Sequence, residues 1–208
     1  MEILEIKDLE TLAKKRVPKM FFDYVNSGSW TETTYNENVS DFQKIKLRQR
    51  VAIDMSNRTL ETKMINQPVS MPVAIAPTGL TGMQRADGEI LAAQAAEEFG
   101  IPYTLSTMSV CSIEAVAEKT KKPFWFQLYV MKDKKFMERL IDRAKEAKCS
   151  ALVLTLDLQL LGQRHKDLRN GLSTPPKLIP KHIYQVLTRP MWCLRMLTTK
   201  NHFFGNIV

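Results

Sequence analysis

The stretch that decides the fold runs from Phe124 to Asp157 and reads FWFQLYVMKDKKFMERLIDRAKEAKCSALVLTLD. It opens and closes on short runs, 124–129 and 151–156, that are apolar on both faces. Between them, a segment that starts at Asp133 repeats its apolar side chains at helical spacing: Phe136, Leu140, Ile141 and Ala144. Such runs alternating with amphipathic helices are typical of parallel strands joined by helical crossovers. The stretch therefore predicts a strand–helix–strand unit.

The same alternation extends toward the N-terminus. Apolar runs begin at Val73 and Tyr103, a helix is predicted from about Asp87 to Gly100, and a shorter helix is capped by Ser112. The four runs thus start at residues 73, 103, 124 and 151, which fits half of a (β/α)8 barrel or part of a doubly wound sheet. No G-x-G-x-x-G follows the first run, and this argues against a Rossmann dinucleotide site.

The flanking segments are less regular. Apolar spacing predicts two short helices, one over residues 9–17 and one from Pro18 to an αL cap at Gly28, followed by an irregular segment over 45–72. Residues 164–208 carry eight basic side chains and one acidic side chain, Asp167, so this segment holds nearly all of the chain's net charge of +8. We expect residues 164–208 to form a basic loop after the fourth strand.

Composition narrows the class of protein. The 208 residues are 44% hydrophobic and 25% charged, as in a folded globular domain. No apolar run approaches the roughly 18 residues that a membrane span needs, and the acidic start predicts neither a signal peptide nor a transit peptide. The three cysteines suggest neither a disulfide framework nor a metal site. A cytoplasmic protein is therefore expected.

Polar residues follow or end each predicted strand: Pro77-Thr78-Gly79, then Ser106, then Gln127 and Tyr129, then Thr155 with Asp157. In parallel α/β folds ligands bind at these carboxyl ends. Uncharged donors and acceptors beside a glycine suit a flat heteroaromatic ligand with amide-like edges, such as a flavin. The alternative is that these side chains only cap helices and turns. Arg164 is a candidate clamp for a substrate carboxylate, or else a solvated loop arginine.

These residues resemble the FMN-dependent α-hydroxy acid dehydrogenase and oxidase family, and most closely its bacterial L-lactate dehydrogenase branch. The resemblance covers nearly the whole chain, in family order and spacing. It rests on residues 18–28 (PKMFFDYVNSG), 74–80 (AIAPTGL), 105–107 (LST), 126–129 (FQLY), 154–157 (LTLD), 162–167 (GQRHKD) and 170–173 (NGLS).

The resemblance implies a TIM barrel with FMN at its C-terminal mouth and oxidation of an L-2-hydroxy acid, most simply L-lactate to pyruvate. By position, Pro77, Thr78 and Gly79 would approach the flavin near its reactive nitrogen, while Ser106, Gln127 and Thr155 would bind the polar edges of the ring. Tyr24 and Arg164 would hold the substrate carboxylate, and Tyr129 would face the substrate hydroxyl or keto oxygen as the catalytic residue of this chain. A histidine base takes the proton in the family.

The resemblance also implies that only the N-terminal half of the barrel is present, because a complete barrel needs about 250 residues. We expect residues 1–208 to form one incomplete domain: 1–71 the N-terminal helices and irregular segment, 72–163 the first βα units, and 164–208 a truncated basic loop. The catalytic histidine motif has no counterpart, and the three histidines present are read as loop residues.

Four strands without partners leave a sheet face uncovered. The chain is therefore expected to be a truncated or split-gene fragment that is inactive alone. Two alternatives stay open. It is one half of a two-chain enzyme whose second chain completes the barrel, or it is a non-enzymatic remnant or interaction module.

Other partners are suggested by residues 175–204, which mix prolines, large apolar side chains and basic charges. This segment fits contact with an anionic membrane surface, which would place the protein on the inner face of the cell membrane, or a mobile cover over the active site. Nucleic-acid binding is disfavoured because the aromatics are not interleaved as stacking platforms. A homo-oligomer is compatible with the complete enzyme.

Overall fold

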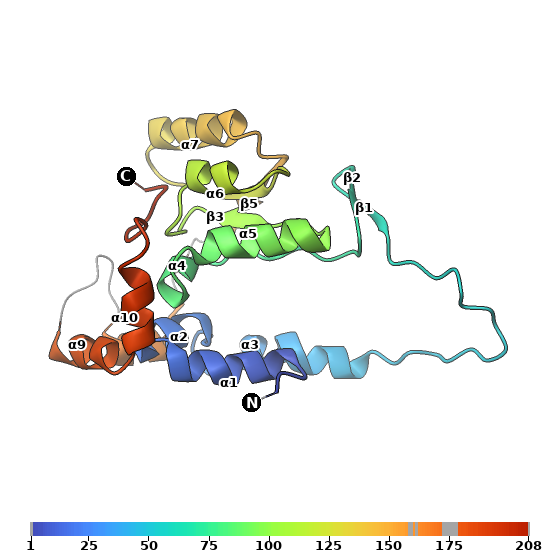
Figure 1. Ribbon diagram of the computed structural model, residues 1–208, viewed down its shortest axis with the longest axis horizontal. Coiled ribbons are helices and arrows are strands. Elements are labelled where there is room, and N and C mark those ends of the chain that lie inside the picture. The colour runs from blue at the N-terminus through green and yellow to red at the C-terminus, as the bar shows by residue number, and fades with distance from the viewer. Residues whose placement is uncertain (1, 158–159, 161, 172–178, 208) are drawn as a thin grey trace.

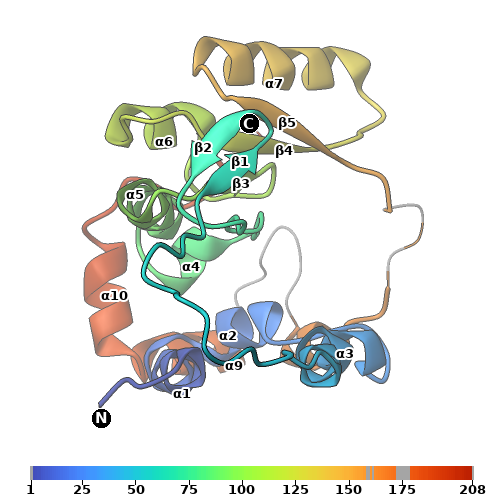
Figure 2. The same ribbon diagram turned by 90° about the vertical axis from the view of Figure 1, so that its right-hand side faces the viewer.

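The computed structural model describes residues 2–157, 160, 162–171 and 179–207. Figures 1 and 2 show two layers: a parallel sheet with helices α5–α7 in one, and helices α1, α2, α3 and α9 in the other, with α4 and α10 between them. The helices are α1 (Ile6–Arg16), α2 (Lys19–Val25), α3 (Thr33–Ser40), α4 (Thr81–Gln84), α5 (Gly88–Phe99), α6 (Ile113–Lys119), α7 (Lys134–Glu146), α8 (His165–Asn170), α9 (Pro180–Leu187) and α10 (Pro190–Met196), with a 3-10 turn at Asp41–Lys44.

The parallel sheet has the order β3 (Thr104–Ser106), β4 (Trp125–Tyr129) and β5 (Ala151–Thr155). The predicted strand–helix–strand unit is thus confirmed as β4–α7–β5. Asp133 caps α7 by accepting from the Phe136 amide at 3.0 Å, and Ser112 caps α6 by accepting from the Ala115 amide at 3.1 Å. These side chains satisfy amides that the first helical turn leaves unpaired.

The core lies between this sheet and helices α5–α7. Phe126 and Leu128 point toward these helices and are buried against Leu140 and Ala144 of α7, among other apolar residues. Leu152 and Leu154 of β5 lie opposite Phe126 and Leu128, so they share that face. Yet they are 46% and 50% exposed, because no described helix covers β5. The face predicted to be uncovered is therefore the outer face of β5.

The first predicted run, at 73–76, is not a regular strand. Ile75 alone bridges Tyr103, donating to Pro102 O at 2.9 Å and accepting from the Thr104 amide at 3.1 Å. The run therefore has the predicted position beside β3 with only one bridge instead of a ladder. Because this run has only β3 as a neighbour among the described residues, fewer hydrogen bonds hold its backbone in an extended conformation.

The N-terminal segment forms helices α1 and α2 as predicted, although α2 ends at Asn26 and Gly28 is not in the αL conformation. The segment read as irregular contains an antiparallel hairpin, β1 (Thr62–Met64) and β2 (Gln67–Val69). Its turn residues Ile65 and Asn66 both have positive φ. That geometry usually recruits Asn-Gly, so the Ile-Asn pair gave no recognisable hairpin signal.

The prediction of a basic loop after the fourth strand is wrong for the described part of residues 164–208, which form α8, α9 and α10. Pro180 and Pro190 occupy the first turns of α9 and α10, where proline starts a helix instead of breaking it. Two of the histidines read as loop residues also lie within helices, His165 in α8 and His182 in α9. His182 is buried with Nε2 2.7 Å from Asn170 O. The buried apolar residues of α2 hold these helices in place.

A second, smaller core accounts for that docking. Phe21 stacks on Trp192 with 5.7 Å between ring centroids, and the Trp192 indole N–H donates to Met83 O at 2.8 Å. Gln185 of α9 accepts from the Met20 amide at 2.9 Å. The clustered apolar side chains of α2 thus find their partners about 170 residues later in the sequence.

The last described residues are packed against the sheet layer. The buried Asn206 accepts from the Ile113 amide at 3.0 Å and donates to Ser109 Oγ at 2.8 Å. A Cβ on Gly205 would lie 2.5 Å from the Ser112 nitrogen, so only glycine fits. Asn206 therefore supplies the acceptor for an otherwise unpaired amide in the first turn of α6, although the two residues are 93 positions apart in the sequence.

Candidate functional site

Three of the predicted cofactor residues form a row of hydrogen bonds on the inner face of the sheet, opposite the helix-covered core. The Gln127 carboxamide accepts from Ser106 Oγ at 3.3 Å and donates to Thr155 Oγ1 at 2.6 Å. Ser106 lies directly opposite Gln127 in the parallel register. Because Gln127 is only 1% exposed, its amide is held in one orientation before any ligand binds.

Two groups of this row, the Gln127 carboxamide and the Thr155 hydroxyl, can still donate a hydrogen bond to a ligand. A carboxamide has two N–H groups, and Thr155 takes one from Gln127. The Thr155 hydroxyl, in accepting that bond, keeps its own hydrogen to donate. A ligand with alternating acceptors and donors along one edge therefore matches this row.

The glycine of the Pro77-Thr78-Gly79 segment makes a close contact with helix α2. A Cβ on Gly79 would lie 2.8 Å from the Tyr24 hydroxyl, so a side chain at this position would displace the phenol. The adjacent Leu80 amide donates to Met108 O at 3.0 Å, joining this loop to the loop after β3. Pro77 and Thr78 are exposed. The structure thus brings Tyr24 to the carboxyl-end rim of the sheet, as the predicted site requires.

Glu89, in the first turn of α5, joins helix α4 to the loop after β3 and was missed by the sequence reasoning. Its Oε1 accepts from the Gly82 amide and the Val110 amide, each at 2.9 Å. The side chain is fully buried, and Oε2 has no hydrogen-bond partner among the described residues. A first-turn glutamate is usually a solvated helix-end charge, so only the tertiary structure reveals this role.

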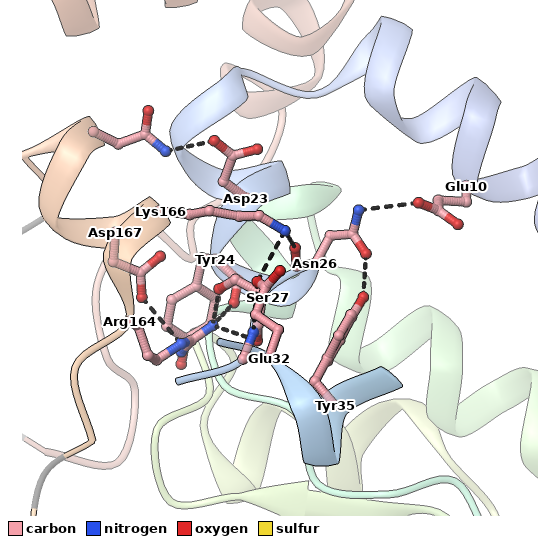
Figure 3. Close-up of polar contacts among 12 residues, drawn as sticks. Glu10, Asp23, Tyr24, Asn26, Ser27, Glu32, Tyr35, Arg164, Lys166 and Asp167 are labelled. Carbon is pink, nitrogen blue, oxygen red and sulfur yellow. Dashed lines mark hydrogen bonds and ion pairs between the residues drawn. The ribbon is translucent and has the colours of Figure 1, made fainter. Parts of the chain in front are cut away.

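Arg164 joins the loop after β5 to helix α2, as Figure 3 shows. Its Nη2 donates to Tyr24 O and, at 2.8 Å, to Ser27 Oγ, while Nε lies 3.3 Å from Asp167. The guanidinium carbon sits 4.7 Å from the centre of the Tyr24 ring. Within the described residues Nη1 has no hydrogen-bond partner, so its two N–H groups form the remaining edge that can bind an anion.

The charges around Arg164 form a connected group (Figure 3). Burial raises the pKa of Asp167, an effect that the adjacent Arg164 opposes. Lys166 pairs with Glu32 at 3.0 Å and donates to Asn26 O at 2.8 Å. Successive residues of α8 therefore hold α2 and the segment after it. The run Gln-Arg-His-Lys-Asp, which places two basic residues next to an acidic one, was the only sequence signal for this group.

Two phenols complete the site. Burial raises the pKa of Tyr24, Arg164 lowers it, and nearby Tyr129 adds to the rise. Burial, reinforced by the negative charge of Asp157, also raises the pKa of Tyr129. Both phenols therefore keep their protons at neutral pH and serve as hydrogen-bond donors.

The residues present fit a flavin ring. The row Ser106–Gln127–Thr155 supplies fixed uncharged donors and acceptors, and Gly79 lets the backbone after the first run lie close to the Tyr24 hydroxyl. When bound, FMN supplies a two-electron acceptor. The described part of the chain has no group of three or more His, Cys, Asp or Glu side chains arranged to hold a metal ion.

The chain is similar to known proteins in sequence. A family model described as FMN-dependent dehydrogenase matches residues 13–207. The L-lactate dehydrogenase of Acinetobacter baylyi (strain ATCC 33305 / BD413 / ADP1) is 45% identical over 208 residues, which are 100% of this chain and 54% of the relative. That of Vibrio parahaemolyticus serotype O3:K6 is 43% identical over 201 residues, covering 96% of this chain and 53% of the relative.

Solved structures extend the likeness to the fold. A structure titled monotopic membrane protein (S)-mandelate dehydrogenase superposes with a TM-score of 0.91 at 32% identity, covering 100% of this chain and 56% of the other. A putative lactate oxidase of Pediococcus acidilactici gives a TM-score of 0.79 at 29% identity, with 92% and 53% covered. The chain spans about half the length of the curated relatives that it matches.

Proposed function

Because this chain belongs to the FMN-dependent dehydrogenase family and has the fold of the N-terminal half of a (β/α)8 barrel, we propose that it forms one half of an enzyme that oxidises an L-2-hydroxy acid. L-Lactate, giving pyruvate, is the proposed substrate, since the curated relatives are L-lactate dehydrogenases. The observation that carries this proposal is the row Ser106–Gln127–Thr155, fixed beside Tyr24 and Arg164.

The residues have distinct roles in this proposal. Ser106, Gln127 and Thr155 hold the polar edge of the FMN ring, and Pro77, Thr78 and Gly79 bring the backbone close to it. Arg164 uses its remaining edge to bind the substrate carboxylate, joined by the Tyr24 hydroxyl. Tyr129 donates a hydrogen bond to the substrate's 2-oxygen, which positions the carbon that is oxidised.

A proton-accepting base is still required, and we propose that a second part of the barrel supplies it. The exposed outer face of β5, at Leu152 and Leu154, supports this, because such an edge is normally covered. Apolar side chains between residues 42 and 60 are exposed as well: Phe42, Ile45, Leu47, Val51, Ile53, Met55 and Leu60. Together they offer an apolar surface to whichever polypeptide carries the remaining strands.

The test is reconstitution. The 208-residue chain is purified alone and together with the C-terminal half of the Acinetobacter baylyi relative, with FMN present. We expect the protein in the mixture to stay yellow with bound FMN after free FMN is removed, and this bound flavin to bleach on addition of L-lactate. The chain alone does not bleach. Bleaching by the isolated chain would contradict the need for a second half, and no yellow complex on mixing would favour a non-enzymatic remnant.

Within that complex, Arg164→Met tests the proposed carboxylate contact. A charge-assisted contact of about 1.5–3 kcal/mol predicts that half-bleaching needs at least roughly tenfold more lactate, with the flavin colour retained. Arg169→Met is the matched control, since Arg169 is exposed one turn further along α8. An identical lactate dependence in the two variants excludes the assigned role of Arg164.

We further propose that α9 and α10 lie on an anionic membrane surface. No helix among the described residues is long and apolar enough to cross a membrane. On these helices and just after them, however, large apolar side chains face solvent: Ile183, Tyr184, Leu187, Met191, Leu194 and Leu197. Lys181, Arg195 and Lys200 lie close to them in the sequence, which suits contact with acidic headgroups. Residues 175–178 of the predicted membrane segment lie outside the described residues.

Replacing Leu187 and Leu194 together with glutamate should then abolish most cosedimentation of the chain with vesicles made of equal parts phosphatidylcholine and phosphatidylglycerol. The double variant removes apolar contact and adds two negative charges. Leu47→Glu with Leu60→Glu is the matched control, because both leucines are exposed between residues 42 and 60. Equal cosedimentation of the two double variants would rule out the α9–α10 surface.

A further inference from the structure

A small cavity lies outside the proposed site, where the end of α1 and the loop after α4 meet α10. Its volume is about 150 Å³. Three arginines line it: Arg16 at the end of α1, Arg85 directly after α4, and Arg195 in the last turn of α10. No acidic residue is among the lining residues. The cavity shares no residue with the row Ser106–Gln127–Thr155 or with the group around Arg164.

The three guanidinium groups are uncompensated. Within the ranges that the structure describes, Arg16, Arg85 and Arg195 make no ion pair and no side-chain hydrogen bond. Elsewhere in the chain, by contrast, Arg143 pairs with Glu114 at 2.6 Å and Arg164 with Asp167. Like charges gathered around one cavity repel, and an anion placed between them would turn that repulsion into attraction.

The apolar and polar walls of the cavity are fixed in advance. Trp192 is held by its bond to Met83 O and by its stacking on Phe21. Gln84 donates to Phe21 O at 2.8 Å, so its carboxamide is held at the cavity wall. A ligand would therefore meet walls that need no rearrangement, which lowers the cost of binding.

We propose that this cavity binds a phosphate group, carried by a phosphate monoester or diester. Guanidinium forks match phosphate oxygens bidentately, and three of them suit the charge and the several oxygens of phosphate better than those of a single carboxylate. The volume accepts one such group but is smaller than the roughly 300–1,000 Å³ of pockets that enclose drug-sized ligands. The exposed Met191 at the cavity allows the rest of the ligand to extend outward.

The test compares two triple variants of the 208-residue chain that lose the same charge. Arg16→Gln, Arg85→Gln and Arg195→Gln remove the three positively charged side chains that line the cavity. Arg48→Gln, Arg50→Gln and Arg58→Gln remove three exposed arginines from the segment before β1. Inorganic phosphate and glycerol 3-phosphate are titrated at constant ionic strength by calorimetry, with acetate as the monovalent comparison. We expect the cavity variant to bind phosphate at least roughly tenfold more weakly than the control variant, which should match the native chain.

A second arm distinguishes the two sources of phosphate. The same variants are sedimented with vesicles of equal parts phosphatidylcholine and phosphatidylglycerol. Arg195 also belongs to the proposed α9–α10 membrane surface, so the single variant Arg195→Gln serves as the reference for vesicle binding. Loss of phosphate binding, with vesicle binding weaker than that of Arg195→Gln, supports the site and assigns it to a lipid headgroup. Loss of phosphate binding with vesicle binding equal to that of Arg195→Gln supports it as a site for a soluble phosphate ester. Equal phosphate affinity in the two triple variants, or no phosphate binding by the native chain, overturns the proposal.

Discussion

Replacing Glu89 with alanine should lower the free energy of unfolding of this chain by about 4 kcal/mol, since two buried amides lose their acceptor at once. The Gly82 and Val110 amides both donate to Glu89 Oε1 at 2.9 Å, and the carboxyl group is fully buried. Each unpaired buried donor costs about 1–3 kcal/mol, and the vacated space adds a cavity. Because small domains are stable by only about 5–15 kcal/mol, this loss removes a large share of the chain's stability.

Urea unfolding followed by tryptophan fluorescence measures this change. Glu98→Ala is the matched control, because Glu98 is exposed on the same helix and should change stability by less than about 0.5 kcal/mol. Glu89→Gln keeps one acceptor oxygen and should recover part of the loss. Glu89→Ala should also speed hydrogen exchange at the Gly82 and Val110 amides. A Glu89→Ala variant as stable as Glu98→Ala would show that α4 and the loop after β3 are held by other contacts.

Asn206→Ala should destabilise the chain by about 3 kcal/mol, although it changes a residue only two positions from the end of the sequence. Its carboxamide accepts from the Ile113 amide at 3.0 Å and from Arg143 Nη2 at 3.3 Å, and it donates to Ser109 Oγ at 2.8 Å and Ser106 O at 3.3 Å. The side chain is completely buried, so truncation leaves the first turn of α6 without an acceptor and without water.

Thermal and urea unfolding of Asn206→Ala measure this loss, with Asn38→Ala as the control, since Asn38 is exposed on α3. Asn206→Asp refines the test, because it keeps the acceptor for Ile113 but loses the amide donor to Ser109. We expect its stability to fall between that of the native chain and that of Asn206→Ala. If Asn206→Ala unfolds at the same urea concentration as Asn38→Ala, the end of the chain does not anchor α6.

The parts predicted correctly from the sequence depend on neighbours along the chain. Asp133 and Ser112 each cap a helix by accepting from an amide three residues later. The apolar faces of α5 and α7 can be recognised in the sequence because apolar residues recur at helical spacing. The candidate site residues were recognisable for a related reason. Strand ends in a parallel sheet converge at one edge, so Ser106, Gln127 and Thr155 were expected together, and a hydrogen-bonded row joins them.

The errors have a common physical origin in contacts between distant residues. Basic and proline-rich composition made residues 164–208 look like a loop, but α9 and α10 form because the apolar side chains of α2 give them a surface to pack on. The hairpin at residues 62–69 was hidden because its turn is Ile-Asn, a pair with no strong turn preference. The secondary-structure preferences of a segment taken alone therefore predict neither α9 and α10 nor the hairpin.

The sequence by itself therefore determined the alternation of strands and helices, the family, and the residues at the strand ends, because these follow from local periodicity and short motifs. Only the tertiary structure decided that Glu89 is a buried acceptor for α4 and the loop after β3, that Arg164 is held against Tyr24, and that Arg16, Arg85 and Arg195 line one cavity. Whether a charged side chain is solvated, buried or gathered with like charges depends on which distant elements pack together, and that is fixed when the chain folds.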